Sequence, residues 1–131
     1  MILPVTLTSA AAAALIAFWL GLRAGRVRSA EKVSHGDGGV PMLTRRMRAQ
    51  LNFVEYTPFV LMLIAAIEIA GKGGTWLAMV SGVYMLARVV HAFGMDNEVA
   101  RNPLRGIGIA VTLLTLLGLA LYAALVAGGV V

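Results

Sequence analysis

Inside an apolar segment of membrane-spanning length, residues 48 to 58 read Arg48-Ala49-Gln50-Leu51-Asn52-Phe53-Val54-Glu55-Tyr56-Thr57-Pro58. On a helix, residues separated by four and then by three positions project from one face. Arg48, Asn52 and Glu55 have this spacing, so a cation, an amide and a carboxylate lie on one face. Polar side chains within membrane segments are rare and usually serve a ligand or an ion. The stretch therefore predicts a polar binding site.

The composition of the chain is that of a membrane protein. It has 131 residues, of which 60% are hydrophobic and only 13% are charged, against about 25% charged in soluble domains. A helix needs about 20 apolar residues to cross the hydrocarbon core, and four segments have this length, at residues 3–22, 51–70, 74–94 and 104–127. We therefore expect an all-α membrane protein, a four-transmembrane-helix bundle that forms a single domain over residues 1–131.

The basic residues predict the orientation of the bundle. Of eleven Lys and Arg residues, only Lys72 lies in the second connection, and the other ten lie in or near the first and third connections. The positive-inside rule places those two connections in the cytoplasm. We expect a bacterial inner membrane, both termini on the non-cytoplasmic side and a site facing the cytoplasm. No basic tail or aromatic-interleaved patch indicates a nucleic-acid partner.

Several kinds of chemistry lack the residues they need. The chain contains no cysteine, so any thiol must come from a ligand. No cluster of His, Asp and Glu has metal-ligand spacing, and no Ser-His-Asp arrangement or phosphate loop is present. We expect neither a metal site nor a hydrolase triad.

A second polar stripe lies in the third apolar segment. Tyr84, Arg88 and His91 have the same spacing as the first set, and Arg101 and Arg105 follow shortly after. One end of the bundle therefore concentrates arginines, which suits a zwitterionic or polyanionic small ligand.

Glutathione has the groups that these side chains would bind. Guanidinium groups bind carboxylates in bidentate fashion, Glu55 can hold an ammonium group, and Asn52 can donate to and accept from a peptide amide. An arginine beside the glutathione sulfur would favour the thiolate by lowering a thiol pKa that is ordinarily about 8.5.

Simpler interpretations compete with a ligand site. The basic cluster at residues 45–48 is typical of a positive-inside anchor with snorkelling side chains. Arg88 and Glu55 could form a purely structural pair between helices. His91 alone is typical of an interfacial histidine, and Glu68, near the opposite membrane surface, is expected to be a solvated helix end.

The stretch from residue 48 to 58 resembles the signature of the MAPEG family, the membrane-associated proteins in eicosanoid and glutathione metabolism, and the resemblance covers nearly the whole chain. It implies that Arg48, Asn52 and Glu55 contact glutathione. It also implies a contact from Tyr56, as in the leukotriene-forming branch.

The segments at residues 87–91 and 101–105 are similar to the microsomal prostaglandin E synthase branch of the family. This similarity implies ligand-contacting or supporting positions for Arg88, His91, Arg101 and Arg105.

The resemblance further implies a homotrimer with glutathione bound between neighbouring subunits. The thiol-activating arginine comes from the end of the first span in some members, where Arg26 or Arg28 fits and Ser29 marks another alignment. Met95 and Gly106 stand where family enzymes often have hydroxyl-bearing residues, so some contacts are expected to be missing.

Three functions follow from these features. The leading one is a glutathione-dependent transferase or peroxidase acting on hydrophobic small-molecule electrophiles that partition into membrane lipid, with Arg26 or Arg28 stabilising the thiolate. The alternative is a non-catalytic glutathione-binding, lipid-binding or scaffold protein. The least favoured is a small multidrug exporter, because such exporters carry an acid in the first span and residues 3–22 contain none.

Overall fold

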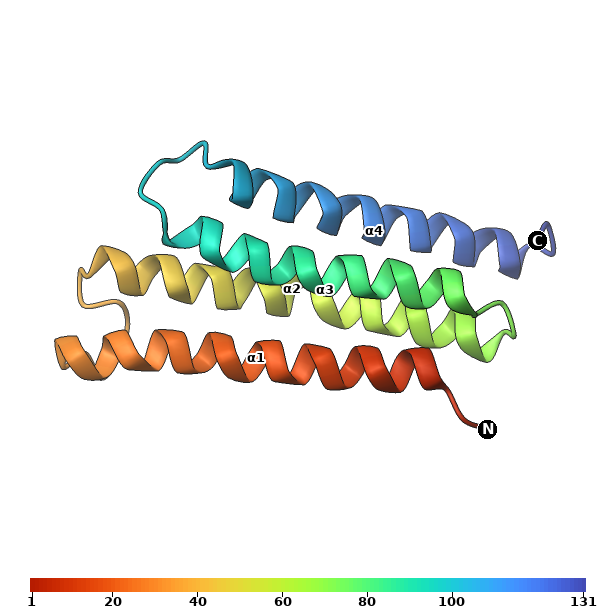
Figure 1. The fold of residues 1–131 in the computed structure, drawn as a ribbon, viewed down its shortest axis with the longest axis horizontal. Coiled ribbons are helices and arrows are strands. Elements are labelled where there is room, and N and C mark those ends of the chain that lie inside the picture. The colour runs from red at the N-terminus through yellow and green to blue at the C-terminus, as the bar shows by residue number, and fades with distance from the viewer.

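The computed structural model describes residues 1–131, which fold into four helices and no strands. These are α1 (Pro4–Glu31), α2 (Pro41–Ile69), α3 (Thr75–Asp96) and α4 (Pro103–Ala127). Each is long and apolar enough to cross a membrane. The helices lie side by side and run alternately in opposite directions (Figure 1). This arrangement confirms the predicted all-α four-helix bundle.

Helices α1 and α2 are longer than the apolar segments that predicted them. α1 continues to Glu31 and α2 begins at Pro41, whereas the apolar segments cover residues 3–22 and 51–70. Hydropathy marks the part of a helix that fits the hydrocarbon core, but backbone hydrogen bonding continues into the polar region. Both extensions lie at the end of the bundle that also holds the α3–α4 connection, while the two termini and the α2–α3 link lie at the other end (Figure 1).

The helix boundaries follow local sequence signals. Gly71 and Gly74 adopt positive φ values of 73° and 136° in the tight α2–α3 link. Asn102 is the N-cap of α4, where its side-chain oxygen accepts hydrogen bonds from the backbone N–H groups of Leu104 and Arg105, at 2.9 and 3.4 Å. Pro103 occupies the first turn of α4. A capping asparagine followed by proline is typical of a helix start, so α4 begins where these two residues stand.

Two glycines let the backbones of α3 and α4 approach closely. A Cβ atom at Gly108 would lie 2.8 Å from the Cα of His91, and one at Gly94 would lie 2.8 Å from the Cα of Arg105. No side chain larger than hydrogen fits at either position unless the helices separate. Small residues of this kind are typical of close helix packing in membranes. The two contacts hold the start of α4 against the last turns of α3.

At the opposite end of the bundle, Glu68 of α2 caps the beginning of α1. Its carboxylate accepts hydrogen bonds from the backbone N–H groups of Val5 and Thr6, at 2.9 and 2.8 Å, and from the Thr6 hydroxyl at 2.7 Å. The first N–H groups of a helix lack partners within it, and a carboxylate there also complements the helix dipole. Glu68 does lie at the end of α2, as expected, and it is half-buried because it also caps α1.

Candidate functional site

A small cavity lies between α2, α3 and α4, near the end of the bundle that holds the long connections. Its volume is about 140 Å³. Each helix contributes two lining residues, which are Arg48, Asn52, His91, Met95, Arg105 and Ile109. Four of the ten predicted site residues therefore meet in one place, although they come from three helices.

The lining of the cavity is positively charged. Two guanidinium groups, those of Arg48 and Arg105, line it together with the Asn52 amide, and no acidic side chain does. His91 is buried, and its Nδ1 atom has no hydrogen-bond partner. Buried polar atoms in native proteins nearly always have a partner. His91 therefore adds an imidazole with an unpaired nitrogen to a cavity whose potential is positive.

Arg88 lies behind the cavity and is 1% exposed. Its Nη2 donates to the Asn52 side-chain oxygen at 2.6 Å, and its Nη1 donates to the Thr112 hydroxyl at 2.8 Å. No carboxylate pairs with it, since the ion pairs of the structure involve other residues. The structure therefore does not contain the alternative, a structural ion pair between Arg88 and Glu55. A buried cation without an acid keeps this wall of the cavity positive.

The other predicted site residues lie outside the cavity. Glu55 is exposed on α2 and forms no ion pair, and Tyr56 beside it is half-buried. Arg101 is exposed in the α3–α4 connection. Arg26 is exposed on α1. Within one chain, these four side chains do not line the space that Arg48 and Arg105 share.

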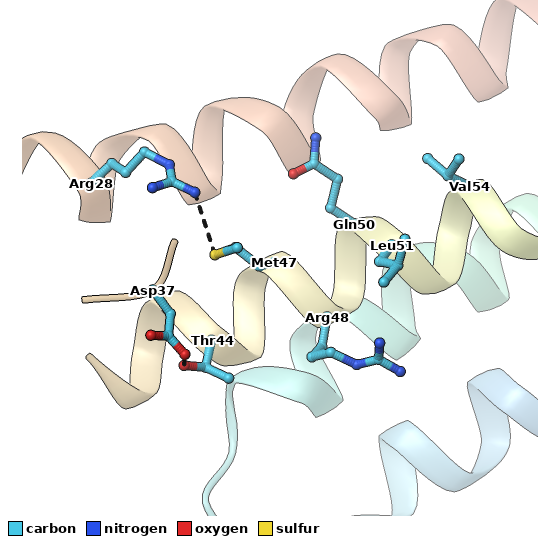
Figure 2. A pocket seen from close by; sticks show the side chains of 8 residues that line it. All are labelled: Arg28, Asp37, Thr44, Met47, Arg48, Gln50, Leu51 and Val54. Carbon is cyan, nitrogen blue, oxygen red and sulfur yellow. Dashed lines mark hydrogen bonds between the residues drawn. The ribbon is translucent and has the colours of Figure 1, made fainter. Parts of the chain in front are cut away.

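Arg28 belongs to a second hollow, formed by the end of α1, the first connection and α2 (Figure 2). Its volume is about 510 Å³, and we call it the outer pocket; it is lined by Arg28, Asp37, Thr44, Met47, Arg48, Gln50, Leu51 and Val54. Arg28 is held by the backbone oxygen of Gly36 at 2.7 Å and by the sulfur of Met47 at 3.4 Å. Gln50 extends toward α1, and Arg48 extends on the other side of α2 (Figure 2). Arg48 therefore borders both hollows.

The outer pocket carries charges of both signs. Asp37 accepts hydrogen bonds from the backbone N–H of Gly39 at 3.0 Å and from the Thr44 hydroxyl at 2.9 Å. These two hydrogen bonds hold the pKa of Asp37 below its ordinary value, and the bond from Gly39 has the larger effect. An ionised carboxylate thus accompanies Arg28 and Arg48 there, whereas the cavity has no acid.

Sequence reasoning missed an ion cluster that ties three helices together next to the site. Arg23 of α1 is buried and pairs with Asp96 at the end of α3. Arg46 of α2 approaches the same carboxylate, with Nε 3.4 Å from Oδ1, and the Arg23 guanidinium lies 4.7 Å from the Trp19 ring centroid. These residues lie far apart in the sequence, so spacing gives no signal for the cluster. Thr112 was also missed, because nothing in the sequence of α4 distinguishes it from Thr115, the other threonine of that helix.

Together, the four apolar helices and the arginine-lined cavity define a membrane protein with a small, positively charged cavity. Residues 6–125 match the family model described as the MAPEG family. Because that match covers nearly the whole sequence, the chain belongs to the MAPEG family.

Two curated proteins are similar to part of the chain. The inner membrane protein YecN of Escherichia coli strain K12 is 34% identical to it over 77 residues, and YecN of Escherichia coli O6:H1 strain CFT073 has the same identity. The aligned part is 58% of this chain and 58% of YecN. The chain therefore spans little more than half the length of these curated relatives.

Proposed function

We propose that the protein is a glutathione-dependent transferase that acts on hydrophobic electrophiles dissolved in the membrane. The observation that carries this proposal is the cavity in which Arg48, Asn52, His91 and Arg105 converge without an acidic neighbour. Membership of the MAPEG family supports glutathione as the ligand that places an anion there.

The size of the cavity supports a site for one end of the tripeptide. Its volume of about 140 Å³ is below the ~300–1,000 Å³ typical of a complete small-molecule site. A glutathione carboxylate fits between Arg48 and Arg105, since guanidinium groups bind carboxylates through paired hydrogen bonds. The ammonium group then extends toward Glu55, which is exposed and free of other ion pairs.

The remainder of the ligand requires a further wall, and we assign it to a second copy of the chain in a homotrimer. Arg28 lies on the α1 side of α2, away from the cavity of its own chain. In this proposal Arg28 of a neighbouring copy, or the exposed Arg26, faces the sulfur. Either cation would stabilise the thiolate by opposite charge.

The reaction needs no nucleophile from the protein. The glutathione thiol releases its proton to water, and the resulting thiolate attacks an electrophilic carbon of the substrate. A carbon–sulfur bond forms while the leaving group departs with its electron pair. The substrate reaches the sulfur from the lipid along the apolar helix surfaces.

We further propose a bacterial inner membrane as the location, because YecN is named as an inner membrane protein. The end of the bundle with the long, basic connections would face the cytoplasm by the positive-inside rule. Both termini lie at the other end (Figure 1). The cavity would then open toward cytosolic glutathione.

The test is calorimetric titration of the purified protein with glutathione, together with conjugation of a chromogenic aryl halide. Arg48→Ala and Arg105→Ala should abolish both binding and turnover. Lys72→Ala, an exposed cation in the α2–α3 link, is the matched control and should change neither. Glutathione binding without turnover of any electrophile would favour the non-catalytic binding protein, and absence of binding in the wild type would overturn the proposal.

A further inference from the structure

Behind the cavity, three side chains form a hydrogen-bonded relay from α4 through α3 to α2. Thr112 is fully buried, and its hydroxyl donates to the backbone oxygen of Gly108 at 2.8 Å. Arg88 donates from one side to the Thr112 oxygen and from the other to the Asn52 oxygen. A hydroxyl has one proton, and Thr112 donates it to Gly108. Thr112 can therefore act only as an acceptor toward Arg88.

The relay determines which end of the Asn52 amide faces the cavity. The two ends of an amide are ordinarily assigned from their hydrogen-bond partners. Arg88 has only N–H donors, so the atom that faces it at 2.6 Å must be the Asn52 oxygen. Asn52 also lines the cavity, and the group left to face that space is its NH₂. Asn52 therefore donates to the ligand, although an asparagine amide can in general either donate or accept.

We propose that Thr112 is a positioning residue, which acts through Arg88 to fix the Asn52 amide so that the cavity offers an N–H donor to a carboxylate or carbonyl oxygen of the ligand. Thr112 does not itself line the cavity. The effect on glutathione binding rests on the proposed function, whereas the orientation of the amide does not.

Loss of the Thr112 hydroxyl would leave one end of the guanidinium buried without an acceptor. Arg88 already lacks a partner for its buried Nε, and an unsatisfied charged donor is costly in a buried setting. The guanidinium would therefore turn to find another acceptor, and the Asn52 amide would lose its fixed orientation.

The chain offers matched variants for the test. Thr112→Val removes the hydroxyl at nearly constant shape, and Thr112→Ser keeps the hydroxyl but removes the methyl group. Thr115→Val makes the same change one turn along α4, at a half-buried threonine whose side chain forms no hydrogen bond. Thr112→Ala removes the hydroxyl without adding a group, and it carries the same expectation as Thr112→Val if the valine variant does not fold.

The first readout needs no ligand. The chain contains three asparagines, so the full protein labelled with ¹⁵N-asparagine gives three pairs of side-chain amide signals by NMR. The pair that disappears in Asn52→Asp belongs to Asn52. That pair should shift in Thr112→Val and stay in place in Thr112→Ser and Thr115→Val. An unchanged Asn52 pair in Thr112→Val would overturn the positioning role.

The second readout is glutathione binding and turnover in the same variants. Thr112→Val should raise Kd and KM about tenfold, the loss expected for one charge-assisted hydrogen bond, with little change in kcat, and Thr112→Ser should restore both. Equal losses in the valine and serine variants would show that only methyl packing matters and would overturn the proposal. If the wild type binds no glutathione, the proposed function and this binding effect both fail, but the NMR result still decides whether the relay orients Asn52.

Discussion

Replacing Gly108 with alanine should push α4 away from α3 and disturb the site without touching any ligand-binding side chain. The new Cβ would lie 2.8 Å from the Cα of His91 and 3.0 Å from the backbone oxygen of Ala87. Carbon atoms ordinarily approach to about 3.5 Å, and the new Cβ would lie still closer to the Cβ of His91 than to its Cα. The two backbones must therefore separate by at least about 0.7 Å. Neither clashing group is a flexible side chain that can rotate away.

The cost can be compared with the gain that alanine brings to any helix. Overpacking of this kind destabilises by about 1–3 kcal/mol, and Gly→Ala in a helix interior stabilises by about 0.5–1 kcal/mol. The difference between these ranges predicts that Gly108→Ala loses up to about 2.5 kcal/mol. Thr112 lies one turn further along α4, so its 2.8 Å bond from Arg88 would stretch toward the limit of a hydrogen bond. Glutathione affinity should fall together with stability.

Gly118→Ala is the matched control, because a Cβ at Gly118 of the same helix meets nothing within 4 Å. Thermal unfolding of both variants in detergent, followed by circular dichroism, separates the two cases. Gly118→Ala should match or exceed the wild-type Tm, and Gly108→Ala should fall below it. Equal Tm values for the two variants would refute the close backbone contact between α3 and α4.

Three further predictions concern charges around the bundle. Glu68→Gln should lower Tm by weakening the cap of α1 while leaving glutathione affinity unchanged; a normal Tm would contradict the cap. Asp96→Asn leaves the buried Arg23 without its counter-charge and should lower the unfolding free energy by about 1–3 kcal/mol in denaturant titrations. Glu98→Gln, which breaks the exposed pair between Glu98 and Arg45, should have little effect. Equal losses in the two variants would be inconsistent with the burial of the cluster. Because the pKa of Asp37 is depressed, its hydrogen bonds stabilise the fold above the ordinary value of 3.8 and lose that effect as pH falls below it. Asp37→Asn should therefore flatten the acid limb of a Tm–pH profile, and an unchanged limb would show that this carboxylate contributes nothing.

The sequence predicts the features of this fold that depend on local pattern. The four spans follow from runs of apolar residues, the start of α4 follows from Asn102 and Pro103, and the tight link follows from its glycines. The polar faces of α2 and α3 follow from helical spacing. Two of those predicted faces do meet, and the cavity between them brings Asn52 and His91 together.

The pairing of side chains between helices could not be read from the sequence. Spacing places Asn52 and Glu55 on one face of α2, but it does not give the rotation of α2 against α3, which decides that Arg88 bonds to Asn52. The same limit hides the Arg23–Asp96 pair, whose members lie 73 positions apart. Such contacts depend on the packing of whole helices.

The central claim is that glutathione binds where three helices bring their cations together. A structure of the protein determined with saturating glutathione tests it most directly. We predict a glutathione carboxylate within hydrogen-bond distance of Arg48 and Arg105, with the Asn52 NH₂ donating to the ligand. Glutathione bound only elsewhere on the protein, or a cavity without ligand at saturation, would contradict it.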